Sequence, residues 1–177
     1  MIVQKLKPSR IKNRINVCFD DGSYLPMLID DVVKLSIKKD KEIDFAVLKK
    51  FSQNYLAKEY ALRQIAISPK TTKILRQKLR QKFQDFDPEK LLKQLKKYLK
   101  EENYIAYIQN KFKKKSNREI TYRLKMAGIN YLSRGDDQAK IRQIIAKKPK
   151  ISISSLISKG FSYPDIKSVF ANLTQIK

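Results

Sequence analysis

The sequence contains no histidine, the side chain that most often acts as a general base and that commonly binds metal ions. Cys18 is the only cysteine, so neither an intrachain disulfide nor a cysteine metal cluster can form. The four glycines belong to no phosphate-binding loop of the Walker or GxGxxG type. Because the carboxylates are scattered as well, the sequence argues against an enzyme such as a nuclease. We expect no catalytic residue and no cofactor.

Two acidic pairs, Asp20-Asp21 and Asp30-Asp31, are the candidates for binding a divalent cation. The first pair precedes Gly22, and an Asp-Gly sequence is expected from the geometry of a hairpin turn alone. A site built only of oxygen ligands needs more converging groups than one pair supplies. We therefore expect no metal site.

Long hydrophobic runs are also absent. No apolar run approaches the ~20 residues that cross a bilayer, and the basic segment Met1–Lys7 lacks the apolar core of a signal peptide. We expect a cytoplasmic protein that binds no membrane. Hydrophobic residues still make up 42% of the 177 residues, which is enough for the core of one domain or of a row of small modules.

Acidic residues are few relative to basic ones. The 17 Asp and Glu residues face 40 Lys and Arg residues, which gives a formal net charge of +23. This excess predicts a polyanionic partner, with nucleic acid as the first candidate and an anionic membrane surface or an acidic protein face as the second. The alternative is a solvated lysine-rich surface without a partner.

Residues 1–43 have the pattern of a small β-hairpin extension. Ile15, Val17 and Phe19 alternate with more polar residues, a tight turn follows at Asp20–Ser23, and the apolar-rich segment Tyr24–Ile29 comes next. Residues 3–6 are a candidate for one more strand. Pro26 would confine its strand to an edge or a bulge of the sheet.

The spacing of apolar residues becomes helical after Asp44, which we expect to cap a long leading helix that ends near Ser68. Ser68-Pro69 and Asp87-Pro88 have the form of further helix starts. Later signals are a capping box at Ser116–Glu119, a terminating Gly128, a helix over about 137–147, and a last helix from Ser162. The apolar residues expected on one face are, in the leading helix, Leu48, Phe51, Tyr55, Leu62 and Ile65, and in the last helix, Ile166, Val169, Phe170 and Leu173.

The helices contain an internal repeat. Leu124–Ile129 and Leu156–Phe161 both read Leu-x-x-x-Gly-apolar, and Leu79–Phe83 resembles them without the glycine. We therefore expect a mainly α-helical protein of tandem, short three-helix, helix-turn-helix-like repeats. The expected divisions are the β-hairpin extension at 1–43, the first repeat with its long leading helix at 44–103, a shortened middle repeat at 104–147 and a C-terminal repeat at 148–177.

In order and spacing, several segments resemble the RecX family of RecA regulators. Family members carry an Ala-Leu-x-x-Leu helix end followed by a Glu-Leu-x-x-Lys-Leu helix, then Ile-x-x-x-Leu-x-x-x-Gly-Ile, and finally an Arg-Gly-Phe segment. The chain departs from the family where an acidic pair is missing after Asn103–Ile105 and where Ile67 replaces a usual arginine, so it resembles a divergent member. The matching segments are Tyr60–Ala66 with Leu75–Leu79, Ile120–Ile129, Lys159–Tyr163, and Asn16–Gly22 in the β extension.

This resemblance implies a monomeric protein without an active site that lies in the helical groove of a RecA–DNA filament. Such proteins limit filament growth or promote disassembly, and so restrain recombination and the SOS response. The resemblance also implies direct binding of single- or double-stranded DNA.

The candidate contact residues are basic residues on predicted polar helix faces and in the run 111–115, where Phe112 could stack on a base or sugar. A rival hypothesis is a stand-alone helix-turn-helix DNA-binding protein that reads bases with helix 72–82, which carries Arg76, Gln77, Arg80 and Gln81. The alternative for each single lysine is simple solvation. The candidates are Arg76, Arg80, Lys93, Lys96, Lys97, Lys113, Lys114, Lys115, Arg118, Arg123 and Lys125.

Overall fold

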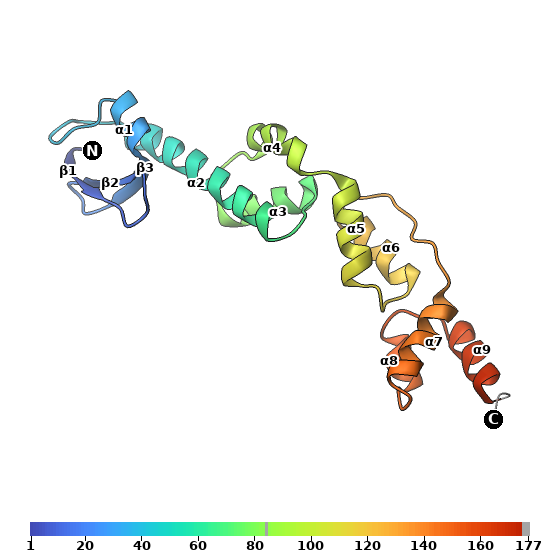
Figure 1. The fold of residues 1–177 in the computed structure, drawn as a ribbon. Coiled ribbons are helices and arrows are strands. Elements are labelled where there is room, and N and C mark those ends of the chain that lie inside the picture. The colour runs from blue at the N-terminus through green and yellow to red at the C-terminus, as the bar shows by residue number, and fades with distance from the viewer. Residues whose placement is uncertain (84, 175–177) are drawn as a thin grey trace. The chain divides into compact units, whose positions relative to one another are not determined.

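The computed structural model describes residues 1–83 and 85–174. The chain is mainly helical with a small three-stranded antiparallel sheet, which confirms the fold class expected from the sequence at this level (Figure 1). It divides into two compact units. The first comprises Met1–Ile67 with Leu75–Leu95, and the second comprises Ser68–Ile74 with Lys96–Lys177.

The sheet of the first unit has the strand order β1-β2-β3, with β1 at Val3–Pro8, β2 at Arg14–Phe19 and β3 at Tyr24–Leu28. The predicted hairpin and the additional N-terminal strand are confirmed. Gly22, at φ 81°, allows the tight turn between β2 and β3. Pro26 lies on β3, an edge strand, where its missing N–H leaves no ladder partner unsatisfied.

The alternation seen in the sequence places Val17 and Phe19 of β2 in the core of this unit, where both are fully buried. Phe19 packs edge-to-face on Phe45, with ring centroids 5.3 Å apart. Residue Ile29, expected in the last strand, instead begins the short helix α1 (Ile29–Lys34), which the sequence analysis missed. Asp30 and Asp31 lie in the first turn of α1, where acidic side chains favour helix formation.

The long helix α2 (Phe45–Ile67) follows the predicted cap, because the Asp44 carboxylate accepts the backbone N–H of Ala46 at 2.8 Å. The predicted apolar stripe is wrong at Phe51 and Leu62, which are 43% and 40% exposed. The residues buried on α2 are mostly small and are Leu48, Ser52, Ala57 and Ala61.

Small side chains on α2 let the helix approach the sheet closely. Ser52 Oγ donates a hydrogen bond to the carbonyl oxygen of Pro26 at 2.8 Å, which ties α2 to β3. A pattern of large apolar residues does not include serine or small alanine side chains. The sequence therefore predicts part of the buried face of this helix at Phe51 and Leu62, which are exposed.

Helix α3 (Thr72–Lys82) begins later than the Ser68-Pro69 signal predicted, because Thr71 supplies the cap: its Oγ1 accepts the N–H of Ile74 at 3.2 Å. Leu75 and Leu79 are fully buried, as expected. Helix α4 (Glu89–Leu95) starts at the predicted Asp87-Pro88 signal, and a 3-10 turn at Lys96–Tyr98 follows it.

The second unit contains a first group of helices, α5 (Glu101–Lys111) and α6 (Asn117–Met126). The predicted capping residue Ser116 accepts the N–H of Glu119 at 3.1 Å. The segment before Leu75 belongs to this unit, where Thr71 donates to the carbonyl oxygen of Ala127 at 2.8 Å. The buried cluster of this group is Tyr104, Ile108, Ile120, Leu124, Ala127 and Ile129.

A second group consists of α7 (Asp137–Lys147), α8 (Ile153–Ile157) and α9 (Tyr163–Thr174). Ile141, Leu156 and Ile166, one from each helix, are fully buried in its core. The predicted helix starts at about 137 and at Ser162 are confirmed. Leu173, expected on the apolar face of the last helix, lies outside the residues whose side chains the structure describes.

Candidate nucleic-acid interface

The second unit has a groove of about 840 Å³ whose lining is rich in lysines. Its lining comes from the turn after α5, one side of α7, the loop 148–151, α8 and the turn after α8. Ile144, Pro149 and Ile151 are the apolar residues of this lining and are called the floor of the groove. The lysines are Lys113, Lys114, Lys140, Lys147, Lys148, Lys150 and Lys159.

Helical spacing explains why α7 contributes four of the lining residues, which are Lys140, Gln143, Ile144 and Lys147. Lys140, Ile144 and Lys147 follow one another at intervals of four and three residues, which places them on the same side of a helix. Ile141 lies on the adjoining side and is fully buried in the core. Packing of Ile141 thereby orients the lysine side of α7 toward the groove.

Hydrogen bonds connect two lysine-bearing segments beside the groove, residues 113–116 and 158–159, which are called its rims. The backbone N–H of Ser116 donates to the carbonyl oxygen of Lys159 at 3.1 Å, and Lys115 Nζ donates to that of Ser158 at 3.2 Å. These bonds join the turn between α5 and α6 to the turn after α8. The two rims are therefore held in a fixed position relative to each other.

Lys140 is anchored rather than free. Its ammonium group donates to Asn117 Oδ1 at 2.7 Å and lies 3.3 Å from Asp137 Oδ1. Asn117 also donates to the carbonyl oxygen of Gly135 at 2.8 Å, which connects the start of α6 to the segment before α7. Among the described residues, the other six lysines of the groove form no ion pair, and no Asp or Glu lines it.

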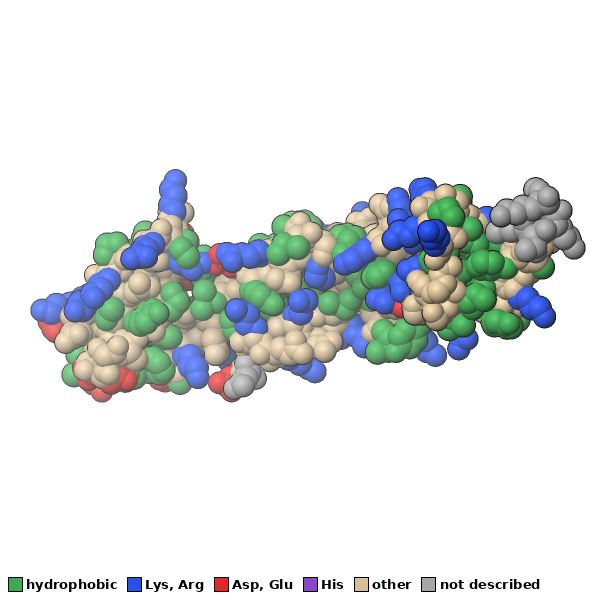
Figure 2. Space-filling view, turned by 90° about the horizontal axis from the view of Figure 1, so that it is seen from below, with side chains coloured by type: hydrophobic (Ala, Val, Ile, Leu, Met, Phe, Trp, Pro, Cys, Tyr) green, Lys and Arg blue, Asp and Glu red, His purple; other side chains and the backbone are tan. Residues whose placement is uncertain are grey.

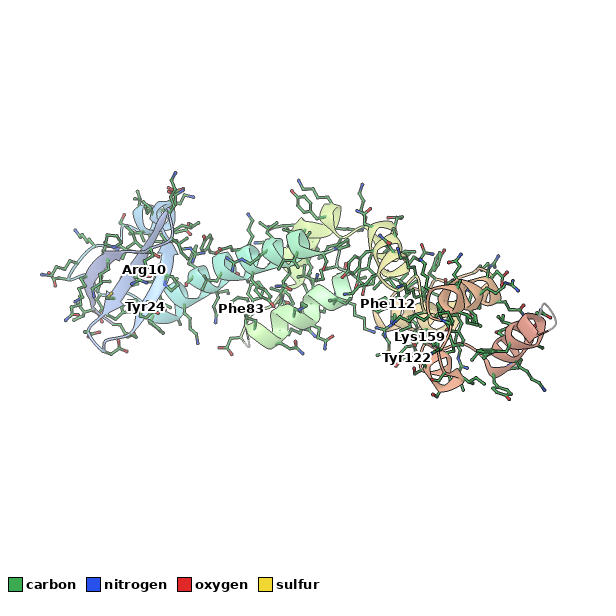
Figure 3. The ribbon with its side chains drawn as sticks, turned by 60° about the horizontal axis from the view of Figure 1, so that its bottom comes forward. Arg10, Tyr24, Phe83, Phe112, Tyr122 and Lys159 are labelled. Carbon is green, nitrogen blue, oxygen red and sulfur yellow. The ribbon has the colours of Figure 1, made fainter. Side chains whose placement is uncertain are left out.

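A smaller hollow of about 380 Å³ lies on the same unit and is lined by Arg118, Tyr122, Ile157 and Gly160, among others. Tyr122 and Ile157 are 58% and 50% exposed. Figure 3 labels Phe112, Tyr122 and Lys159, which come from the end of α5, from α6 and from the turn after α8. On the face drawn in Figure 2, basic side chains lie among apolar patches on both units.

Comparison with known proteins gives a match in structure alone. No family model and no curated protein matches the sequence. A crystal structure described as regulatory protein RecX matches 96% of this chain and 98% of its own chain, with a TM-score of 0.50 and 18% identity. This chain has a RecX-like fold.

Within the RecX-like fold, Arg76 and Arg80 both contact Glu89. Arg76 Nε donates to Glu89 Oε1 at 2.7 Å and Arg76 Nη2 to Oε2 at 3.1 Å, while Arg80 Nη2 lies 3.8 Å from Oε1. The hydrogen bonds from Arg76 hold the pKa of Glu89 below its usual value. These two predicted contact residues are therefore engaged within the first unit.

Arg123 is engaged in a similar way in the second unit. It lies 2.6 Å from Glu119 Oε1, and its guanidinium carbon is 4.1 Å from the centre of the Phe112 ring. The Phe112 ring, which the sequence suggested as a stacking surface for a base, thus already stacks on Arg123. Phe112 also packs against the core of α5 and α6.

The remaining predicted residues lie on the surface. Lys93 is on α4 and Lys96 and Lys97 are in the 3-10 turn after it, all exposed. Lys97 Nζ lies 4.9 Å from the centre of the Tyr98 ring. Exposed or groove-lining positions are also held by Lys113, Lys114, Arg118 and Lys125, while Lys115 bonds to the backbone of Ser158.

Five lysines of the groove were missed by the sequence analysis. The sequence does contain signals for four of them, namely the run Lys147-Lys148-Pro149-Lys150 and the position of Lys140 two helical turns before Lys147. Lys159, however, joins them only through folding, because the turn after α8 returns to the end of α5. The missed residues are Lys140, Lys147, Lys148, Lys150 and Lys159.

Over the part of the chain that the structure describes, no three His, Cys, Asp or Glu side chains are grouped as metal ligands would be. Within the same residues, every helix is too short or too polar to traverse a bilayer.

Proposed function

We propose that this chain is a regulatory protein without catalytic activity that binds RecA–DNA filaments and restrains RecA in recombination and in the SOS response. The observation that carries the proposal is the RecX-like fold, which extends over 96% of the chain. RecA as the partner comes from the resemblance of the sequence to the RecX family. In this proposal the protein acts as a monomer in the cytoplasm.

We also propose that the helices form tandem repeats at 44–103, 104–147 and 148–177 after the extension 1–43. Two matching helix ends support this. Gly128 and Gly160 have φ values of 85° and 88°, and the N–H after each glycine donates to a leucine carbonyl five residues back. Those bonds run from Ile129 to Leu124 at 2.9 Å and from Phe161 to Leu156 at 3.4 Å.

The charge supports a filament as the target. A nucleoprotein filament presents phosphates along a continuous track, and each lysine that neutralises a phosphate releases a condensed counterion. Exposed lysines occur on both units, at Lys93 on α4 and at Lys113 and Lys114 after α5. Binding should therefore weaken steeply as the salt concentration rises.

The rival helix-turn-helix hypothesis depends on Arg76 and Arg80 of α3. A recognition helix needs such side chains free to reach base edges in the major groove. Both guanidinium groups lie within 4 Å of the Glu89 carboxylate, so base reading would first have to break these pairs. This geometry favours the filament over a stand-alone reader of DNA sequence.

A charge-reversal variant tests the proposal. Lys93→Glu, Lys96→Glu and Lys97→Glu together should weaken binding to preformed RecA filaments on single-stranded DNA by roughly tenfold or more at low salt, since three phosphate or carboxylate contacts become repulsive. Binding is measured by fluorescence anisotropy of the labelled protein at several salt concentrations. Circular dichroism checks that the helices stay folded.

The matched control carries the same change of charge on or beside the sheet of the first unit. Lys5→Glu, Lys7→Glu and Lys12→Glu alter three exposed lysines in or beside the sheet. Equal losses in the two variants would show that only net charge matters. Unchanged binding of the first variant at every salt concentration would remove these three lysines from the proposal.

A further inference from the structure

We propose that the lysine-lined groove of the second unit binds one short stretch of single-stranded nucleic acid, with phosphates held by the lysines and bases resting on the apolar floor. The inference rests on the proposed function, because it names the form of nucleic acid that this unit contacts on a filament. Of the groove lysines, only Lys113 and Lys114 are among the candidate contact residues predicted from the sequence.

The charge of the groove selects a polyanion. Six of its lysines form no ion pair among the described residues, and the seventh, Lys140, is the one neutralised by Asp137. Six unneutralised ammonium groups around one hollow repel each other, and an anion with several charges relieves this repulsion. A phosphodiester chain supplies one charge for each nucleotide along a line.

The floor of the groove distinguishes a single strand from a duplex. Ile144, Pro149 and Ile151 present apolar surface between the lysines. In a single strand the bases are free to turn toward such a surface, whereas in a duplex they are paired and stacked inside. A duplex would reach the ammonium groups only with its phosphates and would leave the apolar floor uncovered.

The size of the groove fits a short stretch of strand. Its volume of about 840 Å³ is within the range of roughly 300–1,000 Å³ that pockets for small organic ligands have. Such a space holds about one or two nucleotides of a strand. The groove is therefore a contact point on a longer strand.

The lysine ammonium groups favour binding that does not depend on the base sequence of the strand. Lysine is a flexible point charge, whereas the fixed fork of arginine is the group that reads phosphates or guanine with two parallel hydrogen bonds. No arginine is among the described lining residues. The rims are rigid, since Ser116 and Lys115 bond across to the turn after α8, while the ammonium groups remain adjustable.

The test measures binding of a fluorescein-labelled oligothymidylate to the full chain without RecA, by anisotropy over a range of salt concentrations. Lys147→Gln, Lys148→Gln and Lys150→Gln together should weaken binding by roughly tenfold, and the slope of log K against log salt should fall by about 2, since each phosphate contact contributes ~0.7. The control, Lys12→Gln, Lys38→Gln and Lys39→Gln, removes the same charge from exposed positions in the first unit.

A second variant tests the floor. Ile151→Thr should weaken binding of the strand severalfold while the salt slope stays as in the unaltered protein, because apolar contact is lost and no charge is removed. A hairpin duplex of equal length should bind more weakly than the oligothymidylate and should respond little to Ile151→Thr. Thermal unfolding of each variant checks that the unit remains folded.

Three results would overturn the inference: equal weakening by the groove and control variants, equal or tighter binding of the duplex, or displacement of the strand by inorganic triphosphate at equal phosphate concentration. The last would indicate a site for small anions. Because RecA is absent from this assay, its outcome does not depend on whether the protein acts on RecA. A strand bound in the groove with RecA unaffected would count against the proposed function alone.

Discussion

Replacing Gly160 by alanine should destabilise the second unit by roughly 3 kcal/mol, which combines left-handed backbone strain, loss of a helix cap and steric overlap. Gly160 has φ 88°, and a Cβ there would lie 2.7 Å from Ser116 Oγ and 3.0 Å from Glu119 Cβ. Ser116 is buried and its Oγ caps α6. Rotating that hydroxyl away from the new methyl group would break the cap.

Two other glycines serve as controls for this substitution. Gly22→Ala introduces the same kind of strain at φ 81°, but its Cβ would meet nothing within 4 Å, so a loss of about 1 kcal/mol is expected. Gly128→Ala, at φ 85°, would touch mainly the flexible side chain of Lys73, at 3.1 Å from Cδ, and should fall between the two.

Urea unfolding followed by circular dichroism measures these losses, and hydrogen exchange locates them. Amides of α6 and α8 should lose protection in Gly160→Ala, while those of the sheet should not. If Gly160→Ala loses no more stability than Gly22→Ala, the close packing of the turn at Gly160 on the start of α6 is contradicted.

Glu59→Ala should destabilise the first unit by about 2 kcal/mol, because it leaves a buried guanidinium group without its counter-ion. Arg14 on β2 is only 8% exposed and pairs with Glu59 of α2, donates from Nε to the Tyr55 hydroxyl at 3.0 Å, and lies over the Tyr55 ring. The pair attaches the sheet to the long helix. We place the loss below that of fully buried pairs because the Glu59 side chain is 33% exposed.

Two further variants separate the ion pair from ordinary packing. Arg14→Met with Glu59→Met removes both charges and should recover most of the stability that Glu59→Ala loses. Arg63→Ala removes the exposed partner of Glu59 and should cost less than about 0.5 kcal/mol. If the double variant is as unstable as Glu59→Ala in urea unfolding, then the buried charge is not the cause of the loss.

Local sequence signals predicted much of the fold. The alternation around Val17 and Phe19 gave the hairpin, and Asp44 and Ser116 marked helix starts that the structure confirms. These signals succeed because a strand or a cap depends on residues close together in the chain. The α1 helix was missed because it is six residues long and contains neighbouring valines, which favour strands.

Tertiary contacts decided what the sequence could not. Thr71, rather than Ser68, caps α3, and its hydroxyl also bonds to the carbonyl oxygen of Ala127, which is distant in sequence. The groove depends on a similar long-range contact, between Ser116 and Lys159. In the folded protein Arg76 pairs with Glu89 and Arg123 pairs with Glu119. The helical pattern of the sequence does not show which basic side chains form such ion pairs.

The rate of ATP hydrolysis by RecA on single-stranded DNA, followed while this protein is added, tests the central claim most directly. We expect the rate to fall at amounts well below one molecule per RecA, and the effect to weaken as salt rises, because binding releases counterions from the filament. No change in the rate at equimolar protein and low salt would contradict a role in regulating RecA filaments.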